Sequence, residues 1–204
     1  MKAKFTNVEK SFFTKSHLNK PKTKIPFIQV DNIPDLGLLT SLRFLEWALD
    51  NPQGVISLPT GKTPEYFIKW TQHILSNWNK PEVEQLCRDN GLNASKKPEL
   101  NHLKFVQIDE FYPINSLQHN SFYYFVQQFY IKGFGLNSKN SLLINSFEIP
   151  NSIDESIEDI FPNYKIDLSL RYRDTNSDIE EKQKQTIFAI DQWCSEYENK
   201  IADL

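Results

Sequence analysis

Two short segments of the sequence carry residue types that could do chemistry. The first is LPTGKTP at 58–64, where Thr60, Lys62 and Thr63 supply two hydroxyls and an ammonium around a turn at Gly61. An apolar run precedes this turn and a helical pattern follows it. The free N–H groups of a helix start carry a partial positive charge of about +0.5 and bind anions. The segment therefore predicts a cradle for a phosphorylated substrate; a well-capped turn without a ligand is the alternative.

The same segment predicts a helix start, with Thr63 as the N-cap and Pro64 at the first helical position. It does not have the spacing G-x-x-x-x-G-K-[ST], so it is not a Walker A loop.

The second segment is IDEFY at 108–112, where Asp109 and Glu110 directly follow the apolar run LKFVQI. Ligands of open α/β sheets bind beside the carboxyl ends of the strands. A carboxylate there can act as a general base if it faces the cleft. The alternatives are an acidic pair in a solvated loop, or Asp109 capping a turn. Taken together, the two segments predict a phosphate cradle in one loop and a carboxylate base in the next.

Other polar residues give weaker signals. Asn120 or Ser121 is a candidate N-cap for the next helix, and either could touch a ligand from that position. His119 could serve as an acid or base, but the four histidines share no metal-ligand spacing. The two cysteines, Cys87 and Cys194, form neither a CxxC pair nor a Cys/His pattern, which argues against a disulfide framework or a zinc site.

Strand-like and helix-like segments alternate along the chain. Strands are predicted at Gly54–Leu58, Leu103–Ile108 and Leu142–Ile144, with an edge strand at Phe27–Val30. Helices are predicted at Val8–Phe13, Asp35–Asp50 (with Asp35 as N-cap), Glu65–Trp78, Glu82–Asp89, Phe122–Ile131 and Glu180–Ile201, with an irregular stretch at 145–178. This alternation predicts an α/β protein with a Rossmann-like, mostly parallel sheet and flanking helices.

Composition limits the function classes. The net charge is −3, which gives no electrostatic reason to expect a nucleic acid or an anionic membrane as partner. No apolar run approaches the roughly 20 residues that span a bilayer, and the basic segment 1–26 lacks the apolar centre of a signal peptide. We expect a cytoplasmic protein with a basic arm at 1–26 and one α/β region at 27–204; whether it forms a homo-oligomer is open.

The two motifs resemble those of the glucosamine-6-phosphate deaminase (isomerase) family. GVISLPTGKTPEYFIKW is similar to the family's phosphate-loop segment, in which a strand runs into an L-P-T-G-x-T-P turn and a helix. LKFVQIDEFYPINSLQHNSFYYFVQQFY is similar to its second motif, a strand with an Asp-Glu-aromatic loop and a Ser-aromatic pair. The resemblance covers roughly 27–204 and implies a NagB/RpiA-type fold. Lys62 stands where the family more often has Gly or Ser.

The resemblance also implies an activity: conversion of glucosamine 6-phosphate to fructose 6-phosphate and ammonia, without a metal or organic cofactor. Asp109 matches the enolisation base, and Thr60, Gly61, Lys62 and Thr63 match the loop that contacts the sugar phosphate. Glu110 and Ser121 are predicted to contact the substrate. The family's ring-opening segment would follow the last helix and is not among the 204 residues. This predicts an N-terminal portion of a sugar-phosphate isomerase/deaminase-like domain, incomplete at its C-terminal end.

Two other readings remain open. One is a non-catalytic or truncated module that binds a sugar phosphate. The other is a 6-phosphogluconolactonase-like hydrolase of the same fold, which Phe111 disfavours because that group tends to have Asp-Glu-Arg after the strand.

Overall fold

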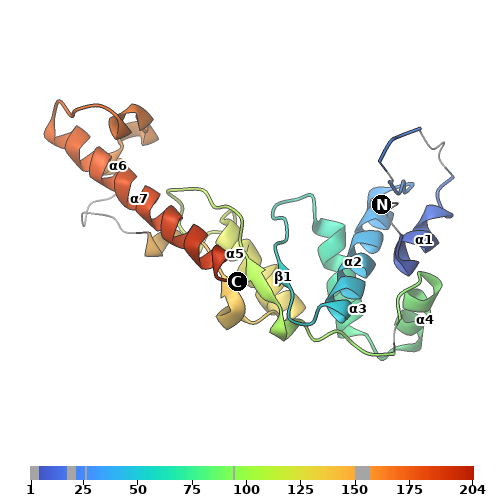
Figure 1. The fold of residues 1–204 in the computed structure, drawn as a ribbon. Helices are drawn as coiled ribbons and strands as arrows, with labels where there is room; N and C mark the ends of the chain where they lie inside the picture. The colour runs from blue at the N-terminus through green and yellow to red at the C-terminus, as the bar shows by residue number, and fades with distance from the viewer. Residues whose placement is uncertain (1–4, 18–21, 26, 94, 150–156) are drawn as a thin grey trace. The chain divides into compact units, whose positions relative to one another are not determined.

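The structure is a computed structural model that describes residues 5–17, 22–25, 27–93, 95–149 and 157–204. Two compact units make up the chain. Unit 1 is Met1–Phe105 with Phe125–Ser141, and unit 2 is Val106–Tyr124 with Leu142–Leu204. Figure 1 shows the elements along the chain.

The elements follow one another in an α/β order. They are α1 (Asn7–Phe13), α2 (Ile33–Asp50), β1 (Val55–Ile56), α3 (Glu65–Ser76), α4 (Pro81–Asp89), η1 (Leu100–His102), β2 (Lys104–Val106), α5 (Phe122–Val126), the π-helical η2 (Gln127–Lys132), η3 (Ser138–Asn140), β3 (Ser141–Leu142), η4 (Ser146–Glu148), α6 (Ile157–Ile160), η5 (Pro162–Tyr164), η6 (Leu168–Arg171) and α7 (Asp178–Ala202).

The three main predicted strands form a sheet in the order β1-β2-β3, and β1 runs parallel to β2. Val55 lies opposite Lys104 and Ile56 opposite Phe105. This confirms the α/β class, although each strand is shorter than predicted. For β1 the physical reason is local: Pro59 soon follows the strand and has no N–H to donate to a ladder.

The predicted edge strand at Phe27–Val30 is wrong. These residues are half-buried but belong to no strand in the described structure. A strand needs a hydrogen-bonded partner as well as apolar side chains.

The chain then enters α2, whose N-cap is Asn32 rather than the predicted Asp35. The Asn32 side chain accepts from the N–H of Asp35 at 2.8 Å.

The core of unit 1 is an aromatic cluster to which α2 and α3 both contribute rings, and these two helices lie side by side (Figure 1). The Phe67 ring lies 5.8 Å from that of Phe44 and 5.6 Å from that of Phe134. Tyr130 joins the cluster with its ring 5.1 Å from Phe134. Gly37 lets the helices approach closely, because a Cβ there would lie 2.4 Å from the Cβ of Tyr66.

Part of the basic N-terminal segment packs into unit 1 as α1. Thr6 and Glu9 form a capping box in which each side chain accepts from the other's backbone N–H, at 3.3 Å and 2.7 Å. Val8 and Phe12 are buried. The predicted short helix is therefore present, and two of its apolar side chains contribute to the core.

Unit 2 is built around the long helix α7 (Figure 1). Its Ile187 is buried in a small apolar cluster with Ile160, Phe161 and Leu170. The segment 160–176, here called the hairpin, contacts α7 through η6. An ion pair ties it to the helix: Nε and Nη2 of Arg171 donate to the two carboxylate oxygens of Asp191, at 2.6 Å and 2.7 Å. No helix in the described part of the chain is long and apolar enough to cross a membrane.

Candidate functional site

The predicted phosphate turn follows β1 in unit 1. Gly61 adopts φ +86° with open space around the position of a Cβ, a backbone conformation that glycine permits at no steric cost. Gly61, Lys62 and Thr63 are exposed, while Thr60 is half-buried. The Tyr130 hydroxyl donates to the carbonyl of Pro59 and ties the start of the turn to the aromatic core.

The start of α3 differs from the prediction. The helix begins at Glu65, Pro64 occupies the N-cap position, and no side chain caps the first turn. Thr63 is therefore not the N-cap, because a turn in which the N–H of Glu65 donates to the Lys62 carbonyl at 3.3 Å precedes the helix. The Thr63 hydroxyl therefore does not cap the helix, and both Lys62 and Thr63 are exposed in the turn.

Asp109 and Glu110 in unit 2 have different surroundings. The Glu110 carboxylate accepts from the N–H groups of Phe122 and Tyr123, at 3.0 Å and 2.7 Å, and from the Ser121 hydroxyl at 2.7 Å. It also accepts from the N–H of Phe111 at 2.9 Å. A carboxylate at a helix start satisfies free N–H groups and interacts favourably with the helix dipole. Glu110 thus holds the loop to the start of α5.

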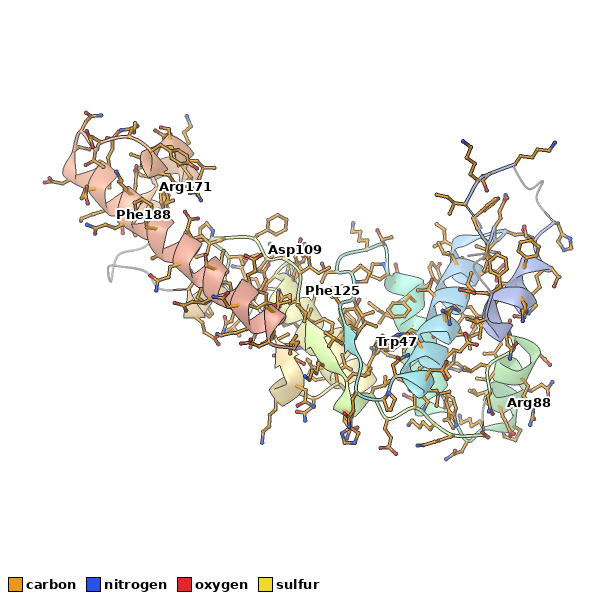
Figure 2. All side chains as sticks on the ribbon, viewed as in Figure 1. Trp47, Arg88, Asp109, Phe125, Arg171 and Phe188 are labelled. Carbon is orange, nitrogen blue, oxygen red and sulfur yellow. The ribbon has the colours of Figure 1, made fainter. Side chains whose placement is uncertain are left out.

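The Asp109 side chain is exposed and forms no hydrogen bond or ion pair with the described residues. It lies on the loop after β2 (Figure 2). Its backbone is nevertheless fixed, since the Gln107 side-chain amide donates to the Asp109 carbonyl at 2.9 Å. Of the two acidic residues, Asp109 is the one whose carboxylate is left available to accept a proton from a ligand.

Ser121 is the N-cap of α5, as predicted: its hydroxyl accepts from the N–H of Tyr124 at 3.2 Å. The same hydroxyl donates to Glu110. These bonds give Ser121 a structural role, and substrate contact by Ser121 or Glu110 stays a prediction. His119 is exposed. Within the described ranges, no three His, Cys, Asp or Glu side chains gather into a metal-binding group.

The turn at 60–63 belongs to unit 1 and Asp109 to unit 2. Because they belong to different units, a single site that combines the phosphate turn with the Asp109 base stays a prediction.

Sequence reasoning missed an apolar pocket in unit 1. It has a volume of about 430 Å³ and is lined by residues of α2, of β1 and of the turn that follows, among them Leu36, Trp47, Ile56, Leu58 and Thr63. The sequence of α2 does contain a feature that indicates such a pocket. Leu36 and Trp47 lie outside the predicted stripe of Leu38, Leu42, Leu45 and Leu49, so the helix carries apolar side chains on more than one face.

Comparisons with known proteins add one remote likeness. No protein-family model and no curated protein matches the chain. One solved structure matches part of the chain at 14% identity and a TM-score of 0.44; it is described as a monomeric glucosamine-6-phosphate deaminase and a missing link of the NagB superfamily. The match covers 62% of this chain and 43% of that one, so the chain spans less than half of that protein's length.

Proposed function

We propose that this chain belongs to an aldose–ketose isomerase/deaminase of the glucosamine-6-phosphate type, with Asp109 as the base. The observation that carries the proposal is that Asp109 and Glu110 have different surroundings. Glu110 is bound to the start of α5, and Asp109 projects an exposed carboxylate from a backbone that is held in place. The family motifs of the sequence supply the substrate class.

The proposed chemistry depends on transfer of one proton between two carbons. In an opened 2-amino-aldose phosphate, a carboxylate removes the proton from C2 while the C1 carbonyl oxygen takes a proton from water, which gives an enol. Return of the first proton to C1, with loss of a proton from nitrogen to water, gives a C2 imine. Addition of water to the imine carbon then releases ammonia and leaves the C2 ketone. Such a general base contributes about 10²–10⁴-fold to the rate. In this proposal Asp109 carries the proton, and Thr60, Gly61, Lys62 and Thr63 hold the phosphate.

The phosphate role has its own physical support. The turn exposes the Lys62 ammonium and the Thr63 hydroxyl just before a helix of twelve residues, whose first N–H groups no side chain caps. Uncapped N–H groups and the positive end of a helix dipole favour an anion at that end.

The test compares wild type, Asp109→Asn and the control Asp50→Asn, which changes an exposed aspartate at the end of α2. Deuterium uptake from D₂O into glucosamine 6-phosphate, followed by NMR, reports the proton transfer, and ammonia release reports the complete reaction. Asp109→Asn should abolish deuterium uptake and keep the rise in melting temperature that the ligand produces in wild type. Full uptake in Asp109→Asn would disprove the assignment of the base.

Binding without deuterium uptake in wild type would favour the non-catalytic sugar-phosphate module. Release of acid from 6-phosphogluconolactone would favour the hydrolase. No effect of any sugar phosphate on melting would overturn the proposal as a whole.

A further inference from the structure

Gln107 is buried, and both ends of its side-chain amide are in use. It is 2% exposed. Its Nε2 donates to the carbonyl of Asp109 at 2.9 Å, and its Oε1 accepts from the N–H of Ile144 at 3.0 Å. A buried amide is retained at little cost only when its donors and acceptors are paired, as they are here. The side chain therefore links the Asp109 loop to the segment that follows β3.

The backbone of Gln107 is also held on both sides. Its N–H donates to the carbonyl of Leu142 at 2.9 Å, and its carbonyl accepts from the Tyr197 hydroxyl at 2.7 Å. The same hydroxyl lies 2.9 Å from the Leu142 carbonyl, so one phenol proton serves two neighbouring acceptors. Tyr197 is itself 9% exposed and stacks on Trp193, with ring centroids 5.3 Å apart. Helix α7 thus fixes Gln107.

Hydrogen bonds therefore hold the chain on both sides of Asp109. On one side its carbonyl is bound by Gln107, and on the other Glu110 is bound to the start of α5. These contacts leave the Asp109 carboxylate itself unbound among the described residues while restricting the peptide units on either side of it. A base is effective only when its lone pair is aimed at the reacting proton, and a displacement of about 1 Å can cost about 10²-fold in rate.

We propose that Gln107, fixed by Tyr197, is the positioning residue that orients Asp109 for proton transfer. The catalytic part of this proposal rests on the proposed function. The positioning part concerns the free protein and can be judged without any substrate.

The test uses two replacements of similar size. Gln107→Met removes both side-chain hydrogen bonds. Gln107→Glu keeps an acceptor for the N–H of Ile144, but it can donate to Asp109 only when the new carboxyl is protonated. Burial favours that neutral form, so the bond to Asp109 should return as the pH falls. The control is Gln118→Met, an exposed glutamine on the same connecting segment.

The first measurement is amide hydrogen exchange in the free protein. Gln107→Met should raise exchange at 109–111 and at Ile144, and Gln118→Met should leave it unchanged. If Gln107→Met does not fold, as circular dichroism would show, the comparison of Gln107→Glu at low and high pH replaces it. Exchange at 109–111 that is unchanged in the folded Gln107 variant would overturn the proposal.

The second measurement is deuterium uptake into glucosamine 6-phosphate. We expect Gln107→Met to lower kcat about 100-fold with little change in KM, because the misplacement affects the base and not the phosphate turn. The activity of Gln107→Glu relative to wild type should rise as the pH falls, which a general loss of stability would not produce. A normal kcat in a variant with a loosened loop would overturn the catalytic part. If wild type takes up no deuterium, the proposed function fails, and the exchange data alone decide whether Gln107 positions Asp109.

Discussion

The two units of this chain are stabilised in different ways. Unit 1 has a large core of interlocked aromatic rings, in which Phe67 contacts Phe44 and Phe134 edge-on at interplanar angles of 78° and 87°. Unit 2 has a small apolar cluster around Ile187, surrounded by paired charges such as Arg171 with Asp191. Phenylalanine rings do not titrate and a tyrosine phenol is neutral in acid, whereas the carboxylates of ion pairs become protonated there. The comparison therefore predicts that the two units respond differently to mutation and to acid.

The paired charges of unit 2 lie on the hairpin that precedes α7. The Arg173 guanidinium donates to both oxygens of Glu180, at 2.9 Å and 2.7 Å, and to Asp167 at 2.9 Å. Figure 2 shows the neighbouring Arg171 on the same hairpin beside α7. These side chains are partly exposed, and exposed pairs contribute little individually. We therefore expect these ion pairs to matter mainly for pH dependence: they set the pH range in which the hairpin stays bound to α7.

The largest expected effect is loss of an aromatic ring in unit 1. Phe67→Ala should lower the free energy of unfolding by about 3–5 kcal/mol, because the ring is 5% exposed and its removal leaves a cavity among rigid neighbours. Urea unfolding measures the change. Phe188→Ala, at a ring that is 46% exposed on α7, is the control and should change the free energy by much less. Equal effects of the two substitutions would contradict the assignment of the core.

A smaller effect is expected in the apolar cluster of unit 2. Leu170→Ala should cost about 2–5 kcal/mol, toward the lower end because the small cluster can collapse onto the vacated space. Hydrogen exchange resolved by segment should show the loss in η6 and α7 before unit 1 is affected. Leu168→Ala, on the same η6 but 54% exposed, is the matched control. Loss of protection in unit 1 first would break the comparison between the units.

Acid should loosen the hairpin of unit 2. Hydrogen bonds from Arg173 and from the N–H of Asn176 lower the pKa of Glu180 from 4.5 to about 2. Bonds from Ser169 and Arg173 lower the pKa of Asp167 from 3.8 to about 2. A lowered folded-state pKa gives stability that is present above the unfolded pKa and is lost as the pH falls through the folded one. The hairpin should therefore weaken progressively as the pH falls from about 4.5 to about 2.

Pepsin cleavage at 165–185, mapped by mass spectrometry, checks this prediction. Arg173→Gln should be cleaved faster than wild type at every pH in this range where the two carboxylates of the wild type are still ionised. Comparing the two proteins at the same pH removes the pH dependence of pepsin itself. Identical cleavage of the two proteins would show that the ion pairs do not hold the hairpin.

The smallest expected effect is at the start of α2. Asn32→Ala should cost about 1 kcal/mol, because it removes the acceptor for the N–H of Asp35. Asn32→Ser supplies another N-cap oxygen and should restore most of this loss. Urea unfolding of the three proteins decides between Asn32 and Asp35 as the cap: if Asn32→Ala changes nothing, Asn32 is not the cap.

The sequence by itself determined the elements that local patterns encode. The alternation of apolar runs and helical stripes predicted the three strands and most helices, because side-chain periodicity depends only on the chain's own geometry. It also identified the turn with Gly61 and the acidic pair after β2, and it narrowed the N-cap of α5 to Asn120 or Ser121. Each of these is a signal within a few residues. The ends of the helices were less accurate. Neighbouring donors and acceptors compete there, as at Asn32, Asp35, Thr63 and Pro64.

Only the tertiary structure decided which acidic residue is free and what holds it. The sequence pattern predicts substrate contact by Glu110, and only the structure shows that its carboxylate accepts hydrogen bonds at the start of α5, 11 to 13 residues farther along the chain. The bond between Tyr197 and Gln107 joins residues 90 positions apart. No local pattern encodes such a contact, because it exists only once the last helix has packed against the ends of β2 and β3. The physical reason is that the hydrogen-bond partners of a buried polar group depend on which residues tertiary folding places next to it. The periodicity of apolar side chains, by contrast, depends only on the local sequence.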